Sequence, residues 1–466
     1  MMTLFSVWLL SGLSTPALPG PTSAVEGEAP PKRPAYAFLR ADEDWSGFEG
    51  GDDPFDPYKR INLGGDTWVS LGGRIESRFE SWNDFTFGAA MGNDDFIVSR
   101  ALAHADFHFG TAWRLFVELK TAQATQRDLP GGRRTLDMDT FEVQQLFAEI
   151  PFAEGAESRW RARVGRQMFS FGKQRLLSPL PWGNTLRSWE GVTVDRYSGP
   201  WRTTAFFTAF VPVDKTDFNE RDDDQLLYGV YARRAESGSK SGLELYAIGT
   251  TRDGVTFNGT TGNSERQTLG ARYWRPLCDN VDLEAEAALQ GGEVGTQDVS
   301  AGFATAELGW KPGGPEDDGR WFLGLDWASG DDAAGGKVGT FDQLFPLGHA
   351  YLGFMDFIGR QNVVAANVGY SCKPAEDLQL RASVHGFWLE DTADAIYNSG
   401  GGVLRAPGSF SSREVAQEFD LLARYKFDRH LSGYAGYSHL FAGDALADSG
   451  PSEDADFFYL GLAFTF

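Results

Sequence analysis

The sequence has little cysteine, no long apolar run and a shortage of positive charge. Nowhere do about 18 apolar residues follow one another, so a membrane-spanning helix is excluded. Cys278 and Cys372 are too few for a disulfide scaffold, which fits an oxidising compartment with little use for free thiols. The 42 Lys and Arg against 65 Asp and Glu give a net charge of −23. Such a chain disfavours a nucleic-acid partner, because phosphate binding needs a basic surface.

The N-terminus lacks the basic residue that usually precedes the apolar core of a signal peptide. Residues 4–13 are apolar and a small-residue pattern ends at Ala24, so we predict a signal peptide over 1–24 whose true start lies upstream. The alternative is a disordered tail. Residues 25–65 are acidic and Pro-rich, which predicts a flexible periplasmic segment. No linker follows residue 65, so residues 66–466 are predicted to form a single domain.

Period-two alternation fills the rest of the chain. In 281–290 the odd positions are apolar and most even positions are acidic. In 321–327 two leucines stand between two tryptophans on one face, as in the aromatic girdles of outer-membrane barrels. The stretch 458–466 alternates in the same way and predicts a last strand with one wholly apolar face. An ordinary β-sandwich strand is the alternative for that stretch.

Eighteen such strands are predicted, and an even number suits a single-chain bacterial barrel. Their predicted starts are residues 67, 96, 111, 140, 159, 187, 201, 225, 242, 265, 281, 301, 319, 362, 378, 414, 430 and 456. Short and long connections alternate between them, as periplasmic turns and extracellular loops do. The predicted long connections include residues 251–264 and 291–300. The predicted fold is therefore an all-β, single 18-stranded antiparallel transmembrane β-barrel in the outer membrane, with short periplasmic turns and long extracellular loops.

The side of the early strands opposite the apolar face carries a basic cluster. Arginine suits a passing carboxylate because its fork pairs bidentately and stays ionised. The alternative is that these arginines pair with inward acids such as Glu76 and Glu118 to make the wall rigid. Later strands place Glu284, Glu286 and other acids inward, so the lumen is predicted to be basic on one wall and acidic on the other. The candidate pore-lining residues are Arg74, Arg78, Arg100, Arg114, Arg161, Arg163, Arg166, Arg272, Arg381 and Arg424.

Four stretches resemble the alginate export family of outer-membrane porins. They are LGGDTWVSLGGRIESRFE, RARVGRQMFSFGKQR with WGNTLRSWEGV, FDQLFPLGHAYLGFMDFIGRQNV and QEFDLLARY, in the family's order over residues 63–466. The resemblance implies an eighteen-stranded barrel with an arginine-lined lumen. Its best-known members conduct a polyuronate out of the cell, although other members serve other solutes.

Two features refine the predicted pore. The connection 330–361 is too apolar to stay in water, so we expect it to fold over or into the pore as a gate; the alternative is an exposed lipid- or partner-binding loop. The candidate gate residues are Phe345, His349, Tyr351, Phe354 and Asp356. Strict alternation places Arg166 on the lipid face, so we predict a bulge at Gly165 that turns it inward, or a position at the rim.

The sequence thus predicts a passive outer-membrane pore and no enzyme, cofactor or metal site. Its predicted cargo is an anionic polysaccharide such as a polyuronate, or alternatively a small polar or anionic solute. Contacts with outer-membrane lipid and lipopolysaccharide, and with periplasmic secretion partners at the short turns, are expected. A barrel hydrolase is a remote alternative, since six histidines are present without a nucleophile motif.

Overall fold

The computed structural model describes residues 33–466, apart from residues 86, 89–91, 112, 129–131, 156–157, 236–238, 315–316, 334 and 409. The predicted signal peptide, residues 1–24, lies outside the described residues. Within the described residues, no helix has both the length and the hydropathy needed to cross a bilayer.

The described chain is almost entirely β-strand. The barrel strands are β2 (Thr67–Asn83), β3 (Asp94–Phe109), β4 (Trp113–Thr125), β5 (Asp139–Glu154), β6 (Arg159–Gln167), β7 (Ser188–Ser198), β8 (Trp201–Val211), β9 (Asp222–Arg234), β10 (Gly242–Phe257), β11 (Thr260–Cys278), β12 (Val281–Val294), β13 (Gln297–Trp310), β14 (Arg320–Ala328), β15 (Val363–Ala375), β16 (Leu378–Leu389), β19 (Glu414–Lys426), β20 (Leu431–Ala442) and β21 (Ala455–Thr465). Smaller elements are β1 (Ile61–Gly64), β17 (Ile396–Tyr397), β18 (Val403–Arg405), α1 (Asp444–Ser449) and the 3-10 turns η1 (Arg40–Asp42), η2 (Asp56–Tyr58) and η3 (Gly348–Ala350).

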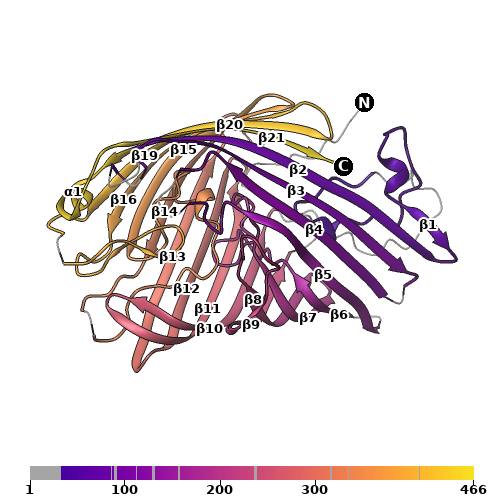
Figure 1. Cartoon of the computed structure of the whole chain (residues 1–466), viewed down its shortest axis with the longest axis horizontal. Coiled ribbons are helices and arrows are strands. Elements are labelled where there is room, and N and C mark those ends of the chain that lie inside the picture. Colours follow the sequence, from indigo (N-terminus) through magenta and orange to yellow (C-terminus); the bar gives the residue numbers. More distant parts are fainter. Residues whose placement is uncertain are drawn as a thin grey trace.

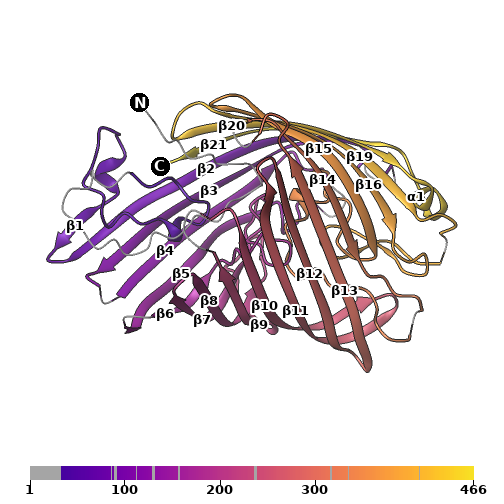
Figure 2. The same ribbon diagram turned by 180° about the vertical axis from the view of Figure 1, so that it is seen from behind.

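Antiparallel pairing closes these strands into a barrel. The sheet holds 19 strands, of which β1 pairs only with β2, so the other eighteen form the wall. Closure is made by β2, which pairs with β3 on one side and with the last strand, β21, on the other. Figures 1 and 2 show the wall from opposite sides. A closed sheet leaves no unpaired edge in the wall, and the predicted eighteen-stranded barrel is confirmed.

Exposure alternates along the strands as the period-two pattern predicts. In β14, Trp321, Leu323, Leu325 and Trp327 are 46, 50, 56 and 39% exposed on the outer face, while the residues between them are buried. Asp326 is one of the buried residues and points inward. The apolar stripe therefore faces outward and the charged side chains face the interior.

The predicted strand positions agree with the structure, and the largest error is at β11, which starts at Thr260 instead of residue 265. Two predicted loops are wrong. Residues 251–264 and 291–300 were predicted as long connections, but β10 and β11 join through residues 258–259, and β12 and β13 through 295–296. The strands extend because Thr256, Thr260 and Thr261 continue the ladder, and Gly259, with a φ of +81°, makes the tight turn.

Residues 33–60, which we call the strap, pack against one end of the barrel. They belong to the segment predicted to be flexible and periplasmic. An Arg40 Nη2 donates to the carbonyl of Phe466 at 2.9 Å, and Lys59 Nζ donates to the carbonyl of Leu71 at 2.7 Å. The strap's Asp53 meets His430 at 2.7 Å. β1 follows the strap at the same end of the barrel as the C-terminus (Figure 1).

Candidate functional site: the barrel interior

Two connections fold into the barrel and pack together there. The first inner loop is residues 168–187, between β6 and β7, and the second inner loop is residues 329–362, between β14 and β15, of which residue 334 is not described. The two loops lie side by side and are joined by backbone hydrogen bonds: Ser178 N donates to Phe345 O, and Phe345 N donates to Leu176 O, both at 2.9 Å. Burial of Leu177 and Phe345 supplies the apolar contact between them.

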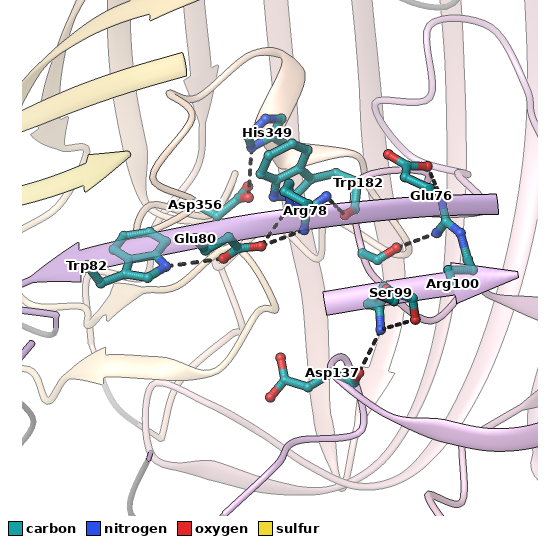
Figure 3. Close-up of polar contacts among 12 residues, drawn as sticks. Glu76, Arg78, Glu80, Trp82, Ser99, Arg100, Asp137, Trp182, His349 and Asp356 are labelled. Atoms are coloured by element: carbon teal, nitrogen blue, oxygen red, sulfur yellow. Dashed lines mark hydrogen bonds and ion pairs between the residues drawn. The ribbon is translucent and has the colours of Figure 1, made fainter. Parts of the chain in front are cut away.

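The five candidate gate residues all lie within the second inner loop and face its neighbours inside the barrel. His349 stacks on Trp182 of the first inner loop with 3.8 Å between ring centroids, and its Nδ1 lies 2.9 Å from Asp356. The other face of His349 meets Phe354. Tyr351 donates its hydroxyl to the carbonyl of Lys173 at 2.5 Å. Figure 3 shows His349 and Trp182 lying flat against each other, with Asp356 beside the histidine.

Two of the candidate pore arginines hold the first inner loop. Arg78 stacks on Trp182 at 3.7 Å and donates to its carbonyl at 3.0 Å, and Glu80 accepts from Arg78 at 2.8 Å (Figure 3). Arg100 donates to the carbonyls of Gly183 and Pro181 at 2.6 and 3.3 Å. These guanidinium groups, on the inner face of β2 and β3, therefore donate hydrogen bonds to the backbone of the first inner loop.

The second inner loop is held by residues of β14 and β19. Arg360 is fully buried, and its Nε and Nη2 donate to Asp326 of β14 at 3.1 and 3.0 Å. The backbone N–H of Met355 donates to Glu418 of β19 at 2.9 Å. A buried guanidinium needs such a partner, since an unpaired buried charge costs several kcal/mol. The loop is therefore tied to the barrel by charge-assisted contacts as well as by apolar burial.

Ion pairing separates the ten candidate pore-lining arginines into two groups. Eight have a carboxylate within ion-pair distance: Arg74 and Arg100 share Glu76, Arg78 meets Glu80, Arg114 meets Asp106, Arg161 and Arg163 share Glu149, Arg166 meets Glu142 and Glu190, and Arg272 meets Glu244 and Glu284. Arg381 and Arg424 have no such partner among the described residues. The strands β2 to β6 form what we call the arginine-rich wall, and their candidate arginines are paired with carboxylates.

Arg166 does not lie where the predicted bulge would put it. The pairing of β6 with β5 and β7 has no register shift at Gly165, so the bulge is wrong. Gly165 has a φ of +128° and approaches the carbonyl of Leu146 too closely for a Cβ, which distorts the strand without inserting a residue. Arg166 is the second-last residue of β6, at the strand end, where it donates to Glu190 and to the carbonyl of Asn219 at 2.7 Å.

The strap covers the arginine-rich wall. Ala41 packs on the inward rings of Phe116 and Phe147, and Arg114 Nη2 donates to the carbonyl of Ala41 at 2.7 Å. Burial raises the pKa of the neighbouring Asp42, while the positive charge of Arg202 and other wall arginines acts to lower it. The strap therefore brings a carboxyl group to a wall whose arginines are already paired.

A cavity of about 580 Å³ remains beside the strap and the inner loops. Its sides come from inward residues of β14, β15, β16, β19, β20 and β21 and from Arg74 and Glu76 of β2. Its inner end comes from Trp182, His349 and Tyr351, and one flank from strap residues 36–38. Charged groups of both signs line it, including Arg381 and Glu307. Burial raises the pKa of Tyr351, so its hydroxyl stays protonated as a donor.

The sequence prediction missed the strap and the role of the first inner loop. The strap is acidic and Pro-rich overall, so its composition indicated a flexible segment. It nevertheless contains Trp45 and Phe48, which are buried against Trp68 of β2. The first inner loop carries a recognisable signal, since Phe169, Phe171, Leu176 and Leu177 make it as apolar as the second. Both segments pack through contacts between residues that are distant in the sequence.

The interior offers no relay for nucleophilic catalysis in the described residues near His385. Ser383 Oγ and Asp420 Oδ2 both lie 3.3 Å from the same ring nitrogen, Nε2, whereas a relay needs the nucleophile and the carboxylate on different nitrogens. Across the described side chains, no group of three or more His, Cys, Asp or Glu could hold a metal ion.

The family model described as alginate export matches residues 67–459, which is the barrel from its first strand to its last. The chain belongs to the alginate export family. Family membership, together with the closed eighteen-stranded barrel, makes this alginate export family protein a β-barrel protein of the outer membrane. It indicates a channel and not an enzyme.

Solved porins share the fold of this alginate export family member at low sequence identity. OprD from Pseudomonas aeruginosa matches with a TM-score of 0.56 and 12% identity over 85% of this chain and 93% of OprD. A BenF-like porin from Pseudomonas fluorescens Pf-5 matches with 0.56 and 12% over 85% and 98%, and OpdK from Pseudomonas aeruginosa with 0.55 and 11% over 85% and 98%. No curated protein sequence matches this chain.

Proposed function

We propose that this protein is a passive outer-membrane channel for anionic solutes, with an acidic polysaccharide of the alginate type as its leading cargo. The observation that carries the proposal is the arrangement of charge: the outer face is apolar, and the interior cavity of the closed barrel is lined by Arg381 and Arg424, which have no carboxylate partner among the described residues. Rings of cationic side chains select anions in pores. Membership in the alginate export family suggests the cargo, because alginate is an anionic polymer with a carboxylate on each sugar.

The inner loops and the strap form a closed state of this channel. The first inner loop, the second inner loop and the strap are held by hydrogen bonds and ion pairs, and no disulfide fixes them, since Cys278 and Cys372 are free. The second inner loop, with Phe345, His349, Tyr351, Phe354 and Asp356, acts as the gate. A polymer passes only when these contacts are released.

The barrel is oriented with its strap end toward the periplasm. At that end the connections are brief, as at residues 199–200 and 376–377, whereas residues 390–413 and 443–454 are at the other end. Outer-membrane barrels have short periplasmic turns and long extracellular loops. This orientation places the cavity mouth, near Asp428 and His430, where periplasmic secretion partners deliver cargo, and the long loops among lipopolysaccharide.

A diffusion channel for small carboxylates is the second candidate. The cavity of about 580 Å³ is of the size that accommodates a single small ligand, and both signs of charge line it. OpdK, which shares the fold, has been crystallised with vanillate, a small carboxylate. In this case the gate stays partly closed and no polymer passes.

The two candidates are separated by measuring the reversal potential of the refolded protein in a planar bilayer under a KCl gradient, with and without polyuronate on one side. Anion selectivity with block by the polymer supports polysaccharide passage. Anion selectivity with block by monomeric uronate only supports the small-solute channel. Cation selectivity without block by either overturns both.

A further inference from the structure

We propose that solutes pass along the wall formed by β14, β15, β16, β19 and β20, and that Arg381 and Arg424 form the subsite there that binds the carboxylate of a ring-shaped acid. The inference rests on the proposed channel function and deepens it. It moves the recognition of anions away from the arginine-rich wall formed by β2 to β6, which the sequence favours, to the wall of β14 to β20 on the other side of β21.

The candidate arginines of the arginine-rich wall are paired with carboxylates, and among them Arg74 lines the cavity, where it pairs with Glu76 at 3.1 Å. Arg100, Arg114, Arg161 and Arg163 do not line the cavity. Arg114 is bound to Asp106 and to the strap carbonyl of Ala41, and Glu149 neutralises both Arg161 and Arg163 at 3.1 and 2.9 Å. A guanidinium whose charge is neutralised by a carboxylate in this way has little attraction left for a passing anion. These residues therefore hold the strap and the wall.

The wall of β14 to β20 presents two guanidinium groups that have no carboxylate partner within the part of the chain that the structure describes. Arg381 of β16 pairs in register with Leu422 of β19, and Arg424 stands two residues further along β19 opposite Gln379. Because the side-chain period of a strand is two, Arg381, Leu422 and Arg424 share the inward face. Diagonal neighbours of this kind lie about 7–8 Å apart at the backbone, so two long side chains can converge on one carboxylate.

Arg381 is positioned to bind a carboxylate in the cavity. Its guanidinium lies over the ring of Phe322 at 4.5 Å, and its Nε is buried without a hydrogen-bond partner in the described structure. A buried donor left unpaired is costly, whereas a carboxylate would accept from it in a charge-assisted bond. Arg424 is exposed to the cavity, which gives a solute access to the pair.

The surroundings of the two arginines select the shape of the ligand. Leu422, Tyr434, Tyr459 and Tyr351 also line the cavity, so flat or puckered rings find apolar and aromatic walls beside the charged pair. Glu307, an acid that also lines the cavity, pairs with Arg320 at 2.8 Å. The chemistry fits the carboxylate of a sugar acid, with the ring packed against the tyrosines.

The test uses the full-length refolded protein in planar bilayers, with D-glucuronate as the blocking probe and D-glucose as the uncharged control. The variant R381Q/R424Q is compared with R161Q/R163Q, which removes the same charge from the arginine-rich wall. We expect R381Q/R424Q to raise the half-blocking concentration of glucuronate at least about tenfold. R161Q/R163Q should leave it within about twofold. R381K/R424K should fall between wild type and R381Q/R424Q, because lysine keeps the charge and loses the fork.

Each outcome has one meaning. An equal shift in both glutamine variants overturns the subsite, because total lumen charge would then explain block, while the anion channel stands. A shift in R161Q/R163Q alone also overturns it and places the path on the arginine-rich wall. A wild-type channel with neither anion selectivity nor glucuronate block overturns the proposed function. If R381Q/R424Q does not refold, R424Q alone serves, since exposed Arg424 is not needed for packing, and no effect of R424Q on block counts against the proposal.

Discussion

Replacing Asp326 with asparagine should release the second inner loop. Asp326 accepts from both Nε and Nη2 of Arg360, which is completely buried. At 3.0 Å and an effective dielectric constant of about 20, the attraction between the two charges is about 5 kcal/mol. Loss of one partner from a buried pair costs about 3–5 kcal/mol, because the other charge stays buried and alone. A cost of about 4 kcal/mol changes the ratio of closed to released loop by roughly a thousandfold.

Single-channel recording measures this ratio as the fraction of time spent in a high-conductance state. D326N should occupy that state far more than wild type, and D223N should not, although it removes the same charge, because Asp223 is 72% exposed. The double variant D326L/R360M should return toward the closed state, since it leaves no buried charge. Equal occupancy in D326N and wild type would refute the conclusion that this ion pair keeps the gate closed.

Three further changes test other contacts of the interior. Burial lowers the pKa of Lys59 to about 8, so the docked strap favours neutral lysine and docking should strengthen as pH rises from 8 toward 10.5; resistance of the strap to protease should follow this trend in wild type and not in K59M. W182A should lose the stacks that join wall and inner loops and unfold more easily by about 3 kcal/mol, measured by denaturant titration. R166A should free residues 212–221, so that trypsin cleaves at Lys215 faster than in wild type.

The barrel wall could be predicted from the sequence because its signal is local and repeated. In β14, four large apolar residues alternate with smaller or charged ones, and the structure exposes the first set and buries the second. The errors at 251–264 and 291–300 arose because Gly and Thr there suggest a loop, whereas cross-strand pairing continues through them. Hydrogen bonding to a neighbouring strand decides whether such residues form strand or loop, and that pairing cannot be read from one segment of sequence.

The interior was less predictable, because it depends on which charges meet. The inward position of Arg161 and Arg163 follows from alternation, but their neutralisation by Glu149 depends on the register between β5 and β6. The apolar character of the second inner loop correctly suggested that it leaves water. Its attachment to Glu418, far along the chain, could not be read from composition.

The bond between Arg40 and Phe466 sets an order of events during folding. The two residues are 426 positions apart, and the acceptor is the carbonyl of the final residue, beside the seam where β21 meets β2. Such a contact cannot form before the last strand has arrived, because closing so long a loop costs entropy that only the finished seam repays. The strap therefore docks late, on a completed cylinder. Each newly made barrel passes through a stage in which the strap end of the barrel is still open, and the strap covers that end only after the wall has closed.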